Sequence, residues 1–105
     1  MTINQYLYGL ITRERESTNL DERKVLRDKI DFARAYKNGT IEAYRSRAIE
    51  REIGKKFSQG AQLAILFNKD THPLEYAEYQ AFRAECKAKV DAKIAAMSAE
   101  ISNSL

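Results

Sequence analysis

The chain has 105 residues, of which 44% are apolar and 31% charged, with four glycines, one proline, one cysteine and a formal net charge of +3. This size predicts a single domain, residues 1–105, and the scarcity of glycine and proline favours helices over a sheet-rich fold. The longest apolar run, Leu63–Phe67, is far too short to span a bilayer and Met1–Leu10 lacks the pattern of a secretory signal, so we expect a cytoplasmic protein with no membrane partner.

The first predicted element covers about residues 3–12. Its apolar residues recur at spacings of three and four, which places them on one side of a helix. They are Ile3, Tyr6, Leu7, Leu10 and Ile11. Gly9 lowers the helix propensity in the middle of this segment, and the same residues can also be written as a strand. Because a strand would have no partner elsewhere in the sequence, we favour the helix and keep the strand as the alternative.

Two longer helices are predicted on either side of the Asn38-Gly39-Thr40 turn. The first follows a cap at Thr18 or Asn19, and the second follows Thr40 and runs to about Lys56. Because the turn is short, we expect the two helices to form a central antiparallel hairpin. The residues expected to face the core are Val25, Leu26, Ile30, Ala33 and Tyr36 on the first, and Ile41, Tyr44, Ala48, Ile49 and Ile53 on the second.

Ser58 can cap a short helix, and Pro73 suits the first position of a long final one. The short helix carries Ala61, Ala64 and Ile65, with Leu63 as a further inward candidate. The stripe of the long helix is Tyr79, Phe82, Cys86, Val90, Ile94 or Lys93, Met97 and Ile101. Unbroken to Ile101, it would be roughly 43 Å long, against a gyration radius of about 13 Å for a compact domain of this size. Its end must therefore project, kink, fray or pack on another chain, and we expect disorder within about residues 96–105.

Residues suited to catalysis or metal binding are sparse. His72 stands alone before Pro73, and Cys86 lies on the apolar stripe of the final helix, so we interpret them as a surface residue and a core residue. The scattered glycines form no phosphate-binding loop, and one histidine with one cysteine makes none of the usual metal clusters. We therefore expect no enzymatic activity, no cofactor and no metal.

Arg47, Arg51 and Lys55 form the most suggestive basic group. Their spacing of four residues places them in one stripe along the third predicted helix, where they could meet the phosphates of a nucleic acid. Glu50 and Glu52 lie beside them and dilute the positive field. We favour a solvated face, with a nucleic-acid-binding helical module as the alternative function.

Four short segments carry a resemblance to known proteins. They are Ile41–Arg45, Ala48–Ile53, Phe57–Gly60 and Tyr79–Lys87, which together place a Phe-Ser step, a short apolar helix and a Tyr-x-x-Phe-x-x-x-Cys-Lys helix in order. In this pattern the chain resembles small uncharacterised bacterial and prophage proteins of the kind encoded near phage tail genes. The resemblance covers about half of the chain, from Thr40 to Val90, and brings no active residues with it.

The sequence therefore predicts an all-α protein, a small helical bundle with a central helix hairpin and a long C-terminal helix. The function we favour is a non-enzymatic protein-interaction or assembly protein, with the phage setting as the implication of the resemblance. Its partner would be another protein or a second copy bound through the C-terminal helix. The candidate interface residues are Tyr76, Tyr79, Ile94, Met97 and Ile101.

Overall fold

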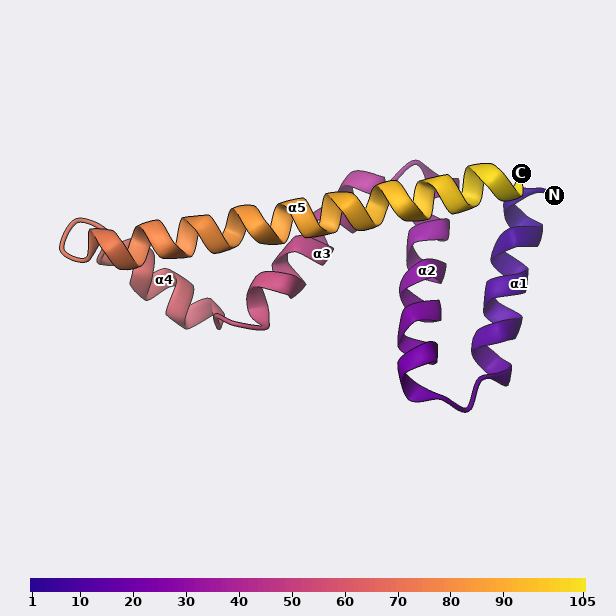
Figure 1. Cartoon of the computed structure of the whole chain (residues 1–105), viewed down its shortest axis with the longest axis horizontal. Coiled ribbons are helices and arrows are strands. Elements are labelled where there is room, and N and C mark those ends of the chain that lie inside the picture. The colour runs from indigo at the N-terminus through magenta and orange to yellow at the C-terminus, as the bar shows by residue number, and fades with distance from the viewer. The chain divides into compact units, whose positions relative to one another are not determined.

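The computed structural model describes all 105 residues and contains five α-helices and no strand (Figure 1). The helices are α1 (Ile3–Glu16), α2 (Leu20–Asn38), α3 (Ile41–Gly54), α4 (Gln59–Phe67) and α5 (Pro73–Ser104). The prediction of an all-α fold with a long C-terminal helix is confirmed. The first segment is a helix and not a strand, and it extends four residues beyond the predicted end at residue 12.

Side chains just outside the helices set several of their boundaries. Thr2 and Gln5 form a capping box, in which each side chain accepts a hydrogen bond from the backbone N–H of the other at 3.2 and 2.9 Å. Asn19, not Thr18, caps α2, because its Oδ1 accepts from the N–H groups of the first turn. Ser58 caps α4 as predicted. Gly39 ends α2 with a φ of 71°, a conformation that glycine adopts without strain.

The described residues group into two compact units, where composition had predicted one domain. Unit 1 comprises residues 1–44 and 93–105, and unit 2 comprises residues 45–92. Both α3 and α5 pass from one unit into the other. The 32 residues of α5 correspond to about 48 Å of helix, so two successive clusters cover its apolar stripe. The buried residues Tyr79, Cys86 and Val90 of α5 lie in unit 2, and Met97 and Ile101 lie in unit 1.

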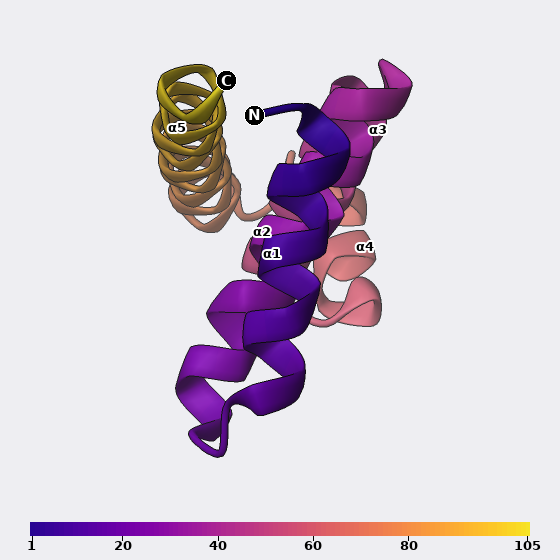
Figure 2. The same cartoon turned by 90° about the vertical axis from the view of Figure 1, so that its right-hand side faces the viewer.

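Unit 1 is built on α1 and α2, which pack side by side in opposite directions (Figures 1 and 2). Phe32 lies fully buried in this unit, with its ring edge-on to Tyr44 at 5.3 Å between ring centres. The Tyr44 hydroxyl donates to Asp28 Oδ1 at 2.6 Å, and Lys93 pairs with the same carboxylate. The other buried apolar residues of the unit are Leu10, Leu26, Ile30, Ala33, Ala35, Met97 and Ile101.

The hairpin and the inward face of α2 differ from the sequence prediction. Only the first turn of α3 belongs to unit 1, so the antiparallel partner of α2 is α1 and not α3. Val25 is 55% exposed, whereas Phe32, absent from the predicted stripe, is 0% exposed. The reason is that α2 is covered on more than one side, by α1 and by the residues around Tyr44. Its buried surface is therefore broader than a single stripe.

Unit 2 surrounds an aromatic cluster of Phe57, Tyr79 and Phe82. The Phe57 ring meets Tyr79 and Phe82 edge-on, at 5.3 and 5.6 Å between ring centres. Arg45 donates to both carboxylate oxygens of Asp91, at 2.7 and 3.1 Å, and so links α3 to α5. This hydrogen bonding by Arg45 lowers the pKa of Asp91. The buried residues Ile53, Ile65 and Cys86 complete the apolar interior.

The C-terminal end is helical through Ser104, contrary to the expected disorder within residues 96–105. Met97 and Ile101 are buried in unit 1, and burial of such side chains offsets the entropy of ordering the last turns. The predicted stripe of this helix left open whether Ile94 or Lys93 faces inward. Ile94 is half-buried, whereas Lys93 is exposed and pairs with Asp28. No helix combines the length and the apolarity that crossing a membrane requires.

Candidate interaction surface

The interface residues predicted from the sequence are largely occupied by the chain itself. Tyr79, Met97 and Ile101 are between 1% and 6% exposed, and Tyr76 and Ile94 are half-buried. The stripe of α5 that suggested a docking face is covered by the residues of each unit instead. Burial of Tyr79, Met97 and Ile101 within the chain leaves little of their surface available for an intermolecular contact.

A different apolar surface is exposed on α4. Leu63, Leu66 and Phe67 are 56%, 39% and 85% exposed, and their spacing of three and four places them on one face of the helix. We call these three residues the α4 apolar face. Ile65 points into the core, as predicted, whereas Leu63 does not. The sequence indicates that some apolar side chains of α4 remain exposed. Five successive residues from Leu63 to Phe67 are apolar and point in all directions around the helix, so one buried face cannot cover them all.

Two adjoining hollows lie beside this face in unit 2. One, of about 340 Å³, is lined by Gln59, Gln62, Leu63, Leu66, Tyr79 and Arg83. The other, of about 410 Å³, is lined by Glu50, Ile53, Gly54, Phe57, Ser58, Gln59, Gln62 and Arg83. Because Gln59, Gln62 and Arg83 line both, the two hollows adjoin, and we call them together the α4 groove.

Arg83 lies at the junction of the two hollows and is held by Tyr79. Its guanidinium carbon is 5.7 Å from the centre of the Tyr79 ring, and one terminal nitrogen donates to the Tyr79 hydroxyl at 3.4 Å. The Tyr79 hydroxyl in turn donates to Gln62 Oε1 at 2.5 Å. No carboxylate lies within ion-pair distance of Arg83, although the side chain is half-buried. The groove therefore contains a cation that has no carboxylate in direct contact, although Glu50 lines the same hollow.

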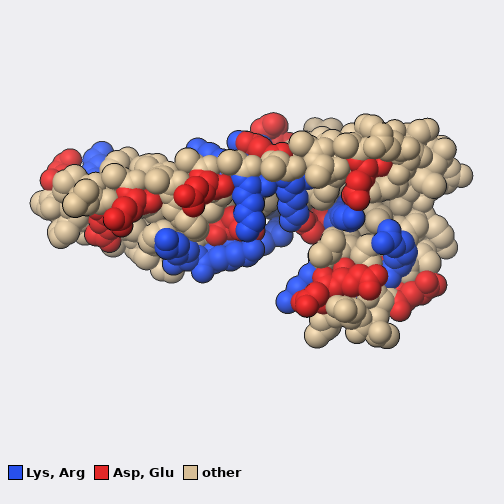
Figure 3. All heavy atoms as spheres, viewed as in Figure 1, with Lys and Arg blue, Asp and Glu red and all other residues tan.

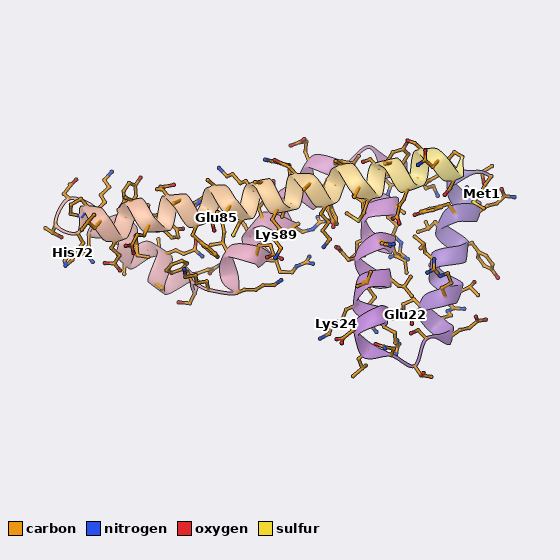
Figure 4. All side chains as sticks on the ribbon, viewed as in Figure 1. Met1, Glu22, Lys24, His72, Glu85 and Lys89 are labelled. Atoms are coloured by element: carbon orange, nitrogen blue, oxygen red, sulfur yellow. The ribbon has the colours of Figure 1, made fainter.

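The predicted basic stripe is solvent-exposed, but only part of it is uncompensated. Lys and Arg atoms gather over the C-terminal part of α3 and the neighbouring stretch of α5, with acidic atoms between them (Figure 3). Lys55 donates to Glu52 at 2.7 Å, and Lys89, on the side of α5 that faces α3, donates to the same carboxylate at 3.1 Å (Figure 4). Arg47 and Arg51 are exposed and have no carboxylate within ion-pair distance.

The hydrogen bond from Lys55, together with that from Lys89, keeps the pKa of Glu52 below its ordinary value. A lowered pKa in the folded state means that the stabilising contribution is present above the unfolded pKa of about 4.3 and is lost as the pH falls through the folded value. Comparing urea unfolding of the wild type and Glu52→Gln from pH 7 to pH 2.5, we expect Glu52→Gln to be less stable at pH 7 by at most about 1 kcal/mol, because both lysines are exposed. The difference should vanish at the acidic end. A difference independent of pH would contradict this assignment.

The remaining reactive side chains do not converge. Cys86 is buried, and burial, followed by the nearby charges of Glu52 and Glu85, raises the pKa of its thiol. His72 is exposed, and its Nδ1 lies 3.0 Å from the Thr71 hydroxyl. No three His, Cys, Asp or Glu side chains are placed so as to hold a metal ion. The α4 apolar face and the α4 groove are therefore the features of the surface that need a functional explanation.

Comparisons with known proteins identify no relative. No protein-family model matches the chain, and neither a curated protein nor a solved structure is significantly similar to it.

Proposed function

We propose that the protein is a non-enzymatic protein-interaction or assembly protein, of the kind encoded near phage tail genes, and that the α4 apolar face carries its contact. The observation behind this proposal is the exposure of Leu63, Leu66 and Phe67 together on one face of a nine-residue helix. The other exposed large apolar residues are scattered along the remaining elements, as on any soluble protein. Contiguous exposed apolar side chains mark interaction sites.

The energetics favour a protein partner for this face. Full burial of a leucine or phenylalanine side chain is worth about 1.5–3 kcal/mol, so three such residues supply several kcal/mol to an association. The gain is realised only against another apolar surface, and leaving the face exposed has no compensating benefit within unit 2. An assembly role accounts for this exposure directly.

Site-specific photo-crosslinking of the full chain in its native cell tests this function. A photo-crosslinking phenylalanine derivative at Phe67 should give a discrete protein adduct, because that side chain would contact the partner. The matched control places the same derivative at Ala88, an exposed position of α5 in the same unit. An adduct from position 67 that is lost on Leu63→Ser is the expected result. Absence of any adduct from positions 63, 66 and 67 would argue against the function.

A nucleic-acid-binding module is the second candidate, supported by the uncompensated Arg47 and Arg51 on the exposed side of α3. With Lys55 they offer two to three phosphate contacts, so raising the salt from 50 to 200 mM should weaken binding about 10- to 40-fold. The test measures the affinity of a 20-base-pair duplex by fluorescence anisotropy. The double variant Arg47→Glu, Arg51→Glu should lose binding, whereas Lys24→Glu, an exposed lysine of α2, should lose little. No binding at 50 mM salt would dismiss this candidate.

A further inference from the structure

We propose that the α4 groove binds an amphipathic partner helix that places a carboxylate on Arg83 and apolar side chains against Leu63 and Leu66. The inference rests on the proposed protein-interaction function and deepens it, because it specifies the chemistry of the partner. Three features of unit 2 carry it: the unused hydrogen-bonding capacity of Arg83, the order of side chains along the groove, and the position of Glu50.

The Arg83 guanidinium is pre-oriented and mostly unused. A guanidinium has five N–H donors. In Arg83, one of them donates a hydrogen bond, to the Tyr79 hydroxyl at 3.4 Å. The cation–π contact with the Tyr79 ring, whose hydroxyl is itself held by the hydrogen bond to Gln62, restricts the motion of this side chain. Pairing with a carboxylate would use two parallel N–H donors, and the pre-oriented plane reduces the entropy lost on binding. Arg83 therefore favours a planar acidic group.

The groove requires apolar groups next to that acidic group. One hollow is lined by Leu63 and Leu66, which belong to the exposed α4 apolar face. The other is lined by the half-buried ring of Phe57. A small anion would pair with Arg83 but leave these apolar side chains exposed. A helix with apolar residues at positions i, i+4 and i+7 and an acidic residue at i+3 presents all four on one face and covers both kinds of surface.

Glu50 disfavours a polyanionic ligand in the same groove. Its side chain lines the hollow that contains Ile53, Phe57 and Arg83, so a phosphate chain running along the groove would meet a like charge. A single carboxylate at Arg83 carries less negative charge than a phosphate chain, so Glu50 repels it less. The ligand class that fits is thus a peptide with one acidic residue among apolar ones, and not a nucleic-acid backbone.

The probes are three alanine-rich helical peptides with blocked ends, each with leucines at i, i+4 and i+7. They differ only at i+3, which is glutamate, glutamine or lysine. Binding to the full chain is followed by ¹H–¹⁵N NMR titration. We expect the glutamate peptide to bind about tenfold more tightly than the glutamine peptide, the effect of one charge-assisted pair at a half-buried site, and the lysine peptide to bind most weakly. The amides of α4 and of the helix around Arg83 should shift.

Substitutions of Arg83 distinguish recognition of the carboxylate from non-specific apolar binding. Arg83→Gln should remove the tenfold preference, and Arg83→Glu should reverse the ranking, so that the lysine peptide binds best. That reversal requires a folded groove, so it cannot arise from unfolding of the variant. Lys87→Gln makes the same charge change as Arg83→Gln, at an exposed position one turn further along α5. It should leave the ranking unchanged.

Each remaining result decides against the inference. Equal affinity of the three peptides would show that Arg83 does not select a carboxylate. No peptide binding, together with adducts from position 67 in the cell, would overturn this partner chemistry and leave the protein-interaction function standing. No peptide binding and no adducts would remove both.

Discussion

Replacement of Phe32 by alanine is expected to destabilise unit 1 by about 3–5 kcal/mol, the range for removing a buried aromatic ring. The side chain is 0% exposed, and its ring packs edge-on against Tyr44. The variant would leave a cavity among the residues that hold α2 to the rest of the unit. A domain of this size has a total stability of only about 5–15 kcal/mol, so the loss is a large part of it.

Urea unfolding followed by two-dimensional NMR measures this effect and assigns it to a unit. In Phe32→Ala, the native amide cross-peaks of residues 1–44 should disappear at a much lower urea concentration than in the wild type. Val25→Ala, on the exposed side of the same helix, is the matched control and should change the stability by no more than about 0.5 kcal/mol. If Phe32→Ala and Val25→Ala destabilised the protein equally, Val25 would face inward, as the sequence predicted, and the buried face of α2 described above would be wrong.

Replacement of Tyr79 by alanine should have an effect of similar size, about 3–5 kcal/mol, in unit 2. The Tyr79 side chain is 1% exposed and packs against the ring of Phe57, while its hydroxyl joins Gln62 to Arg83. Tyr79→Phe keeps the ring and removes only the hydroxyl. It should cost about 1 kcal/mol, because the half-buried Gln62 loses its donor but can accept from water.

Tyr76→Phe provides the control for Tyr79→Phe. The Tyr76 hydroxyl accepts a hydrogen bond from Gln80 at the surface, at 2.9 Å, so its removal should leave thermal unfolding nearly unchanged. A wild-type melting curve for Tyr79→Ala in the isolated protein would contradict the buried position of this side chain. It would instead support the sequence prediction of an intermolecular contact.

The candidate site was only partly accessible to sequence reasoning. The stripe of Arg47, Arg51 and Lys55 was found from its spacing, but spacing could not show that Lys55 shares Glu52 with Lys89, which is 37 residues away in the sequence. The apolar composition of α4 indicated that some of its side chains remain exposed. No pattern in the sequence points to Arg83, because the feature that distinguishes it is the lack of a carboxylate within ion-pair distance, and this depends on the packing of α3, α4 and α5.

What the sequence determined is local. The caps at Asn19 and Ser58 and the glycine after α2 act through hydrogen bonds and backbone preferences within a few residues, so the helices could be located by reading along the chain. The three-and-four repeat of α5 likewise identified which of its residues are buried.

The tertiary structure decided what covers each helical face. Periodicity shows that side chains share a face, but it does not show which element packs against that face, because apolar burial is non-directional. Hence the partner of α2 proved to be α1, and the stripe of α5 is divided between two units of the same chain. For the same physical reason, only the folded structure could show that the apolar residues left exposed are those of α4.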